Sequence, residues 1–383
     1  MTVVERCGLH VERSALNSQK GNPALIRLIR AEIEKRGPVS FAWFMQQALY
    51  HPEHGYYASG RCAIGRTGDY FTNVSVGLLF GQLLGAQFAE IWERLGKIDD
   101  FMIVEQGAHD GQFARDVLQS VQKRVPEFFA ALRYQIVEAF TFLQDRQSRT
   151  LEAFRDKIEW YDSLQPFVGV HFSNELLDAM PVGLISGGVE KLVDLEGDKF
   201  VFVERPLLQG TTASEPSREE SAFNQAALDW IDSVAANLQC GYVIAIDFGR
   251  SGDKFQEGIQ VRAQHRNVDS PFEQIGHADI TMNVDWTSVA QRAQANGLRV
   301  AGFTDQHHFL TGIISELGSG NWHQSPLPDS PTAKRQLQTL LHPEMLGRAF
   351  QVLALAKNVD PDGRPLAGFK FAREPRAVLG IAE

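Results

Sequence analysis

The stretch from Glu105 to Gly111 places a carboxylate directly before a turn that contains two glycines. An apolar run that begins at Phe101 precedes it, and a helical pattern begins near Gln112. In an open α/β sheet, such a turn outside the carboxyl end of a strand is where a nucleotide-like cofactor binds. A dinucleotide site would show GxGxxG, which lets a pyrophosphate approach the helix N-terminus, and that spacing is absent. The turn therefore suits a nucleoside cofactor without a phosphate.

S-adenosylmethionine is such a cofactor. Its methionyl end needs a tight backbone turn, and its ammonium and sulfonium groups favour a nearby carboxylate such as Glu105. We assign Gly107, Ala108 and Gly111 to that turn. The alternative is an ordinary connection between a strand and a helix, which this motif alone does not exclude.

Two further acidic residues follow later strands of the expected sheet. Glu138 ends the strand expected at 133–138, where a carboxylate can accept hydrogen bonds from both ribose hydroxyls. Asp162 follows a short strand expected at 157–160 and is the candidate for binding the adenine amino group. A lone glutamate at a strand end can instead stabilise the N-terminus of the next helix, so Glu138 has a purely structural alternative.

The segment Asn174-Glu175-Leu-Leu-Asp178 follows the strand expected at 168–172, where transferases of this architecture orient their acceptor. Glu175 and Asp178 could neutralise a cation and take a proton from a nitrogen that attacks a methyl group, so we assign them to catalysis. Asn174 is assigned to the cofactor site. A nucleobase methyltransferase would have Asn/Asp-Pro-Pro-aromatic here, to stack the base, and that motif is missing. Helix capping by Asn174 and Asp178 is the structural alternative.

A glycine-bearing loop at residues 65–73 precedes the first expected strand of the sheet. Such a loop can fold over a cofactor, and Gly68 and Asp69 are its candidate binding residues. Glycine and aspartate are also favoured in ordinary turns, so a simple connection is the alternative.

From Phe101 onward, strand and helix patterns alternate, which predicts an α/β fold with a parallel sheet covered by helices. Strands are expected at 101–105, 133–138, 157–160, 168–172 and 241–247, with helices at 112–124 and 140–153. Two late strands, at 298–303 and 349–357, suit a sheet that ends in an antiparallel hairpin.

Other segments extend this core. Helices are expected to begin at Asn22-Pro23 and at Ser40, and Ser75 is expected to cap a helix that runs to Leu95. Residues 182–204 predict a β-meander, followed by a helix whose apolar face includes Trp230. We therefore expect an N-terminal extension at 1–96, a core at 97–181 and 239–383, and an insertion at 182–238.

The composition argues against several functional classes. The 383 residues carry a net charge of −10 and have a pI near 5.6, which disfavours a nucleic-acid partner. Cys7, Cys62 and Cys240 are too far apart to form a CxxC site, and no HExxH motif is present, so no metal is expected. No signal peptide or membrane-spanning run is visible, which predicts a soluble, cytoplasmic protein.

With these residues in place, the chain resembles a family of S-adenosylmethionine-dependent methyltransferases. The family contains a mitochondrial complex I assembly factor that methylates a protein arginine, together with bacterial relatives. The resemblance runs through most of the chain and is most specific at Gly-Asp-Tyr-Phe-Thr, residues 68–72, and at Asn-Glu-x-x-Asp-Ala-x-Pro, residues 174–181.

The resemblance implies a class I methyltransferase fold, which is Rossmann-like, with S-adenosylmethionine held by the loop at Gly68-Asp69, the turn at 105–111 and Glu138. It also implies a protein substrate, such as a respiratory-complex subunit, methylated on an arginine ω-nitrogen. Glu175 can orient a guanidinium, which stays charged at pH 7.

One departure from the family pattern lies inside the turn. The family usually has Glu-x-Gly-x-Gly-x-Gly, whereas His109 replaces the middle glycine here, and a Cβ hinders the left-handed conformation and the close approach that glycine permits. Two alternatives therefore stay open beside the arginine methyltransferase. One is a member with weak or lost activity that acts as a protein-binding assembly factor, and the other is a small-molecule methyltransferase.

Overall fold

The computed structural model describes residues 21–58, 72–186, 188–206, 220–250, 258–263, 266–317, 330–359 and 363–381. The chain divides into two compact units. The smaller unit contains residues 1–63, 181–223 and 259–281, and the larger contains 64–180, 224–258 and 282–383. The division expected from the sequence grouped the segments differently, because it placed the helix after residue 224 with the insertion and the helix before residue 96 with the N-terminal extension.

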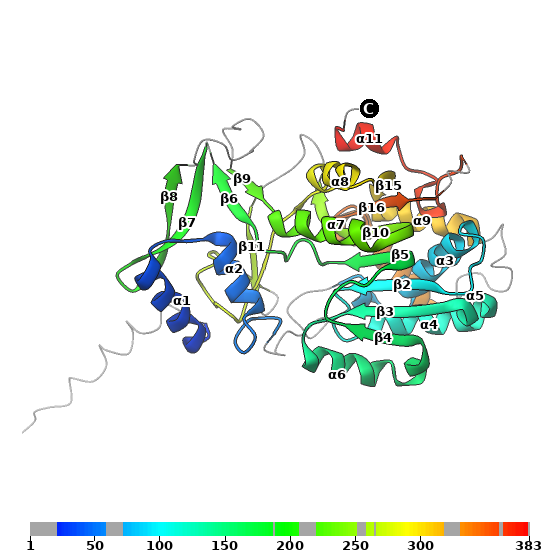
Figure 1. The fold of residues 1–383 in the computed structure, drawn as a ribbon, viewed down its shortest axis with the longest axis horizontal. Coiled ribbons are helices and arrows are strands. Elements are labelled where there is room, and N and C mark those ends of the chain that lie inside the picture. Colours follow the sequence, from blue (N-terminus) through cyan, green and yellow to red (C-terminus); the bar gives the residue numbers. More distant parts are fainter. Residues whose placement is uncertain are drawn as a thin grey trace, which may run out of the picture. The chain divides into compact units, whose positions relative to one another are not determined.

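The larger unit is built on an eight-stranded sheet with the strand order β15-β16-β10-β5-β2-β3-β4 (Figure 1). The eighth strand, β14, pairs with the end of β10. Strands β4, β3, β2, β5 and β10 are mutually parallel, whereas β16 is antiparallel to both β10 and β15. The strand bounds are β2 Phe101–Gln106, β3 Leu132–Val137, β4 Ile158–Tyr161, β5 Phe167–Asn174, β10 Leu238–Arg250, β14 Val284–Asp285, β15 Arg299–Asp305 and β16 Phe350–Lys357.

Helices cover both faces of this sheet. Their bounds are α3 Leu79–Arg94, α4 Gln112–Arg124, α5 Pro126–Ala131, α6 Thr141–Thr150, α7 Gln225–Asn237, α8 Trp286–Ala295, α9 Gln306–Leu317, α10 Pro331–Leu341 and α11 Pro375–Leu379. Shorter helical turns span Val74–Val76, Glu152–Lys157, Pro343–Gly347 and Ala367–Phe369.

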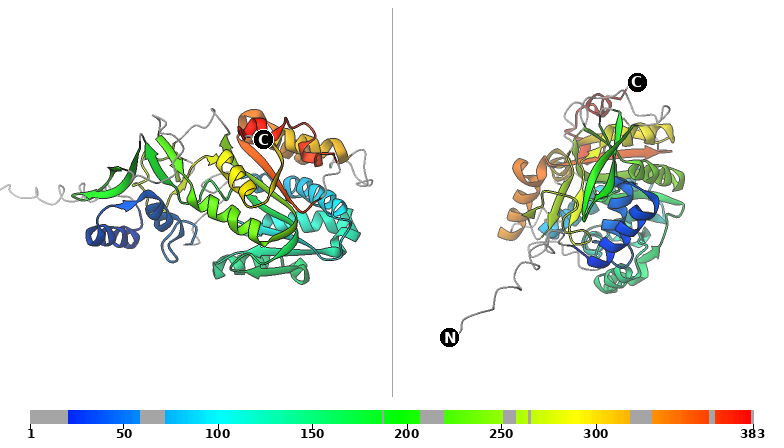
Figure 2. Two further views of the ribbon diagram at one scale, coloured as in Figure 1. Left: turned by 45° about the horizontal axis from the view of Figure 1, so that its top comes forward. Right: turned by 90° about the vertical axis from the view of Figure 1, so that its left-hand side faces the viewer.

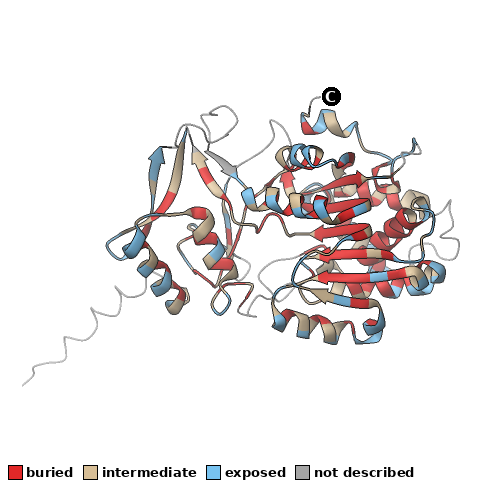
Figure 3. Cartoon of the chain, viewed as in Figure 1, coloured by how far each residue is buried: buried red, intermediate tan, exposed pale blue. Residues whose placement is uncertain are grey.

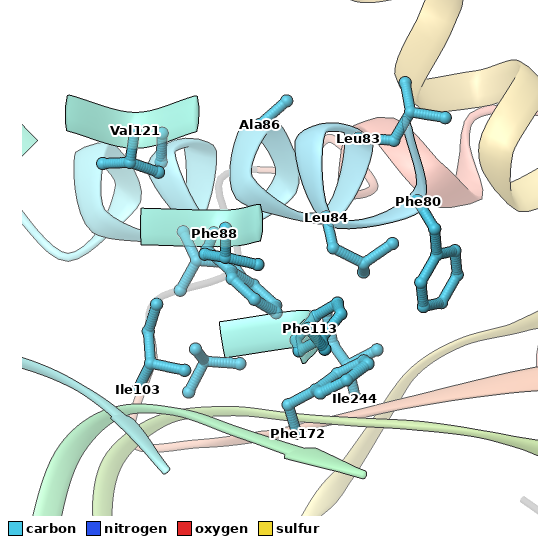
Figure 4. Packing of buried hydrophobic residues seen from close by; sticks show 14 of the residues in the cluster. Phe80, Leu83, Leu84, Ala86, Phe88, Ile103, Phe113, Val121, Phe172 and Ile244 are labelled. Atoms are coloured by element: carbon cyan, nitrogen blue, oxygen red, sulfur yellow. The ribbon is translucent and has the colours of Figure 1, made fainter. Parts of the chain in front are cut away.

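Two apolar clusters form because neighbouring residues of a strand point to opposite faces. Ile103 and Ile244 pack in the cluster that contains residues of α3, α4 and α9, whereas Val104 and Val243 pack in the cluster that contains residues of α7 and α8. The central strands are accordingly buried along most of their length (Figure 3). Figure 4 shows the first cluster, in which Phe113 of α4 stacks on Phe172 of β5 with ring centroids 4.3 Å apart.

The expected sheet is confirmed, with one difference at a helix start. The antiparallel late strands are β15 and β16, and helices α9 and α10 lie between them in the sequence. The helix expected to be capped by Ser75 begins instead at Leu79, because Ser75 and Thr72 exchange hydrogen bonds in a turn before it. The expected start signals at Asn22-Pro23 and Ser40 are confirmed.

The smaller unit contains the predicted β-meander, drawn in green in Figures 1 and 2. The meander strands β6, β7 and β8 are joined by β1 and β9 into one antiparallel sheet, and β11, β12 and β13 form a second small sheet. The bounds are α1 Pro23–Arg36, α2 Phe41–Tyr50, β1 Val39–Ser40, β6 Gly183–Ser186, β7 Val189–Glu196, β8 Lys199–Pro206, β9 Glu220–Phe223, β11 Gln260–Ala263, β12 Arg266–Asn267 and β13 Asp279–Thr281.

Aromatic rings pack against one another in this unit. Phe272 contacts Phe44 of α2 and both Phe200 and Phe202 of β8, with ring centroids 4.8–6.1 Å apart. Within the described ranges of the whole chain, no helix is long and apolar enough to cross a membrane. The same ranges contain no group of three His, Cys, Asp or Glu residues arranged to hold a metal ion.

Candidate active site

The turn between β2 and α4 adopts left-handed backbone conformations at three residues. The φ angles are +82° at Gly107, +45° at His109 and +79° at Gly111. The Gly111 N–H donates to the Ala108 carbonyl at 2.8 Å and closes the turn. A Cβ on Gly111 would lie 3.0 Å from Leu151, so α4 begins in close contact with the segment that follows α6. The turn is therefore tight, as a cofactor without a phosphate requires.

Glu105 lies at the last but one position of β2 with its carboxyl group buried. The residue is only 4% exposed, and the Tyr134 hydroxyl on the neighbouring strand β3 donates to its Oε2 at 2.7 Å. Burial raises the pKa of Glu105 to about 8, although the Tyr134 hydrogen bond acts in the opposite direction. A cation placed beside this carboxyl group would favour its ionised form.

Glu138 follows β3 and is held by the residue before α6 and by a side chain within that helix. Its Oε1 accepts from the Phe140 N–H at 2.9 Å, and its Oε2 accepts from Gln147 at 3.3 Å. The Gln147 amide group also donates to the His109 carbonyl at 3.0 Å. Gln147 thus connects the glycine turn to the carboxylate that the sequence assigns to the ribose.

A chain of hydrogen bonds joins the end of β5 to the segment before α3. The Asn174 amide group donates to Glu175 Oε1 at 2.8 Å, and the Asn73 amide group donates to Asn174 Oδ1 at 3.0 Å. The Asn73 backbone N–H also donates to Glu175 Oε1 at 3.0 Å. Two uncharged donors, the Asn174 side-chain amide and the Asn73 backbone N–H, therefore hold the Glu175 carboxylate at the carboxyl edge of the sheet.

The orientation of both amides follows from this carboxylate, which can only accept hydrogen bonds when ionised. Asn174 must turn its NH₂ group toward Glu175 and its oxygen toward Asn73, so Asn73 in turn must donate to Asn174 with its NH₂ group. The Asn73 Oδ1 atom therefore takes no part in this chain of hydrogen bonds. It is buried and has no hydrogen-bond partner among the described residues, in a side chain that is 0% exposed.

Asp247 of β10 fixes the turn that follows Glu175. Its Oδ2 accepts from the N–H groups of residues 176, 177 and 178 at 2.7–3.3 Å, and its Oδ1 accepts from the Phe248 N–H at 2.7 Å. Burial raises the pKa of Asp247 to about 7, and these N–H donors act in the opposite direction. Glu175 itself has a φ of +55°, so the turn presents it in a conformation that a free chain rarely adopts.

The structure brings most of the predicted site residues to one edge of the larger sheet. Glu105, Glu138 and Asn174 lie at or just beyond the carboxyl ends of β2, β3 and β5, which are neighbouring parallel strands. Ala108 and Asp178 are buried and Gly107 is exposed. Asp162 follows β4, the edge strand beside β3, and is exposed. Gly68 and Asp69 lie outside the described residues.

The structure also decides the capping alternative for the acceptor segment. The chain between Asn174 and Gly183 forms turns and leads directly into β6, so no helix begins there for Asn174 or Asp178 to cap. Their polar groups serve the turn instead. Asp178, for example, accepts from the Met282 N–H with its backbone carbonyl at 2.8 Å.

Four residues that hold this site were not assigned from the sequence: Asn73, Tyr134, Gln147 and Asp247. Asp247 carried a usable signal, because it is an acidic residue near the end of an apolar strand, as Glu105 is. Asn73, Tyr134 and Gln147 act through contacts with residues distant in the sequence, which no local pattern reveals.

Three features together indicate the class of this protein, a methyltransferase that binds a nucleoside cofactor. They are the strand order, the carboxylates beyond adjacent parallel strands, and the tight turn in place of a phosphate-binding loop. The chain belongs to the family described as "Putative S-adenosyl-L-methionine-dependent methyltransferase", whose profile matches residues 83–304. The protein is thus an S-adenosylmethionine-dependent methyltransferase.

Individual relatives agree with this assignment. The "Protein arginine methyltransferase NDUFAF7 homolog, mitochondrial" of Drosophila melanogaster is 26% identical over 92% of this chain and 90% of that protein. The human protein arginine methyltransferase NDUFAF7 is 25% identical over 95% of this chain and 89% of that protein. A crystal structure of a COG1565 superfamily member from Burkholderia thailandensis, bound to S-adenosyl-homocysteine, has a TM-score of 0.81 and 27% identity over 92% of this chain and 96% of that one.

The residues at the sheet edge fit S-adenosylmethionine. The turn at 107–111 keeps the left-handed conformations that a close backbone approach needs, including at His109. Glu105 offers a buried carboxyl group for a cationic group, and Glu138 offers a half-buried carboxylate for hydroxyl groups. The cofactor, when bound, supplies an electrophilic methyl group on a sulfonium centre.

Proposed function

We propose that this methyltransferase transfers the methyl group to an ω-nitrogen of arginine in a protein substrate. The observation that carries the proposal is the acceptor set at the end of β5, where the Glu175 carboxylate lies beside the Asn73 Oδ1 atom, which is buried and has no hydrogen-bond partner in the described part of the chain. Both accept hydrogen bonds, so the site favours a ligand that donates several N–H groups. A guanidinium carries five such donors in a planar arrangement.

The chemistry needs orientation and one proton acceptor. The ω-nitrogen forms a bond to the methyl carbon while the carbon–sulfur bond breaks and its electron pair remains on sulfur. The same nitrogen gives up one proton, for which the Glu175 carboxylate is the acceptor. Asn174 and the Asp247-bound turn hold that carboxylate in place before the reaction, so little reorganisation is required.

Two further facts support an arginine-bearing protein as the substrate. The relatives from Drosophila and human are named protein arginine methyltransferases, and the similarity covers nine-tenths of their length. The net charge of −10 favours the approach of a basic partner. Neither fact selects a particular acceptor protein.

Isotope-labelled S-adenosylmethionine tests the proposal directly. The enzyme is incubated with protein extract from cells that lack it, and the labelled residues are identified by mass spectrometry. We expect label on arginine ω-nitrogens. Label confined to lysine, or only to small molecules, would overturn the proposal, and cofactor binding without any transfer would favour an assembly factor.

Glu175→Gln tests the role of the carboxylate. We expect the transfer rate to fall by roughly 10²-fold or more, because the variant keeps a hydrogen-bond acceptor but cannot take a proton at neutral pH. The dissociation constant for S-adenosylhomocysteine should stay within a factor of about two, as for the exposed control Glu152→Gln. An unchanged transfer rate would remove Glu175 from the mechanism.

A further inference from the structure

His109 occupies the position where a glycine is expected in the cofactor turn, and it adopts the glycine conformation. Its φ of +45° lies in the left-handed region, which residues with a Cβ rarely occupy. The turn is therefore left-handed at this position although His109 carries a Cβ. The open question is what the imidazole does at the centre of the cofactor site.

Gln147 holds the His109 backbone in place by a hydrogen bond to its carbonyl group. It is 0% exposed, and its Oε1 accepts from the Trp160 indole N–H at 2.9 Å. An indole nitrogen can only donate, so the Gln147 amide orientation is fixed. Its NH₂ group must then face the His109 carbonyl at 3.0 Å and Glu138 Oε2 at 3.3 Å, which sets the spacing between the turn and that carboxylate.

The imidazole ring lies among acidic groups. Its Nδ1 is 3.8 Å from Asp110 Oδ1. Glu138 is held close to the same turn, because one Gln147 amide group donates both to the His109 carbonyl and to Glu138 Oε2. The second ring nitrogen, Nε2, is buried and has no hydrogen-bond partner among the described residues. Buried polar atoms in native proteins nearly always have a partner, so this nitrogen points to a ligand atom.

We propose that His109 is a cofactor-binding residue, whose Nε2–H donates to the oxygen of a ribose hydroxyl whose proton Glu138 accepts. A hydroxyl group has one hydrogen and two lone pairs, so it can serve both partners at once. His109 thus extends the cofactor site on the ribose side and does not obstruct it. The inference concerns the cofactor alone and holds whichever acceptor the enzyme methylates.

Calorimetric titration with S-adenosylhomocysteine tests the sign of the effect. His109→Gly keeps the turn conformation and removes the ring. We expect its dissociation constant to rise by roughly threefold to tenfold, the range for one lost hydrogen bond. An obstructing ring would give the opposite result, tighter binding by the glycine variant, and no change would also overturn the proposal.

A second ligand separates a direct contact from a change in the turn. The same titrations are made with the 2′-deoxy and 3′-deoxy analogues of S-adenosylhomocysteine. If His109 binds a ribose hydroxyl, its removal weakens binding of the parent ligand but not of the analogue that lacks that hydroxyl. Equal losses for all three ligands would mean that the ring acts only through the backbone, and would overturn the proposal.

Two further variants complete the test, one as a control and one as a second replacement of His109. Asn358 has a φ of +52° and follows β16 beside Gln239, at the start of β10, so Asn358→Gly changes a left-handed residue away from the turn. It should bind all three ligands as the wild type does. His109→Asn, which also tolerates the left-handed region, keeps the test open if the glycine variant unfolds. We expect it to show the same loss of discrimination between S-adenosylhomocysteine and the deoxy analogue. Failure of the wild type itself to bind S-adenosylhomocysteine would overturn the assignment of His109.

Discussion

Glu105 shows at the scale of one residue how burial keeps a carboxyl group in its uncharged form. Its carboxyl group is buried beside Tyr134, and desolvation disfavours the anion more than the single hydrogen bond stabilises it. A cation bound beside this carboxyl group would reverse that balance. The position is unfavourable for an anion in the protein without such a cation.

Replacing Glu105 with glutamine should change how stability depends on pH. The pKa of Glu105 is raised from 4.5 to about 8, so between these values the folded protein holds a proton that the unfolded chain has released. The free energy of unfolding therefore falls as pH rises through this window, by up to about 1.4 kcal/mol per pH unit. Glu105→Gln removes this dependence and keeps an oxygen for the Tyr134 hydroxyl.

Urea denaturation at a series of pH values measures the difference. The variant and the wild type should have similar stability near pH 5, and the variant should be more stable near pH 8 by roughly 2 kcal/mol or more. Glu152→Gln, an exposed site, should follow the wild type throughout. Parallel curves for Glu105→Gln and the wild type would show that the buried carboxyl group titrates normally.

The sequence predicted which acidic residues lie at strand ends but not how they are held. Glu105 and Glu138 could be placed because strand periodicity is local, and parallel strands end at one edge. Tyr134 and Gln147 could not be found, because their side chains act on residues 9 to 38 positions away in the sequence. These contacts depend on the register between neighbouring elements, which composition does not set.

At the scale of elements, the packing of α3 on α4 depends on two glycines in α3. A Cβ on Gly81 would lie 2.7 Å from Asp116 Cβ and 3.2 Å from backbone atoms of α4. A Cβ on Gly85 would lie 3.3 Å from one methyl group of Val121. The first contact cannot relax without moving a helix, whereas the second needs only a small shift of a side chain.

Alanine at these two positions should therefore have opposite effects. We expect Gly81→Ala to destabilise the protein by about 1–3 kcal/mol, the usual effect of overpacking. Gly85→Ala should be neutral or stabilise by up to about 1 kcal/mol, because alanine favours the helix over glycine. The midpoint of urea denaturation compares them, and equal shifts in the same direction would contradict this account of the α3–α4 contact.

Element boundaries were predictable where the signal lies within a few residues. Asn22 and Ser40 cap helices as expected, since each side chain reaches N–H groups two or three residues ahead. Ser75 does not cap the helix, because its hydroxyl group accepts from the Thr72 N–H and donates to the Thr72 carbonyl in a turn before the helix. Helix α10 was not predicted, although Ser330 followed by Pro331 is the same signal as Asn22-Pro23.

At the scale of the whole molecule, the chain enters the smaller unit three times, and this organisation was the hardest to predict. Val39 of β1 pairs with Val193 of β7, and the Asn22 N–H donates to the Ile275 carbonyl. Pairings over 150 residues or more have no local pattern. The larger sheet was predictable because its strands alternate with helices, which restricts its topology to few arrangements.

The net charge of −10 leads to a final prediction about how the substrate is reached. If the acceptor is an arginine in a basic protein segment, long-range attraction should assist its binding, and salt should weaken it. We expect the KM for an arginine peptide flanked by lysines to rise by roughly threefold or more between low salt and about 0.15 M, where the Debye length is about 8 Å. S-adenosylhomocysteine has no net charge, so its dissociation constant should hardly change over the same range. The matched control is the same peptide with glutamates in place of the lysines, whose KM should stay level or fall. Identical salt responses for the two peptides would mean that the acidic surface plays no part in selecting the substrate, and that recognition rests on the acceptor set around Glu175 alone.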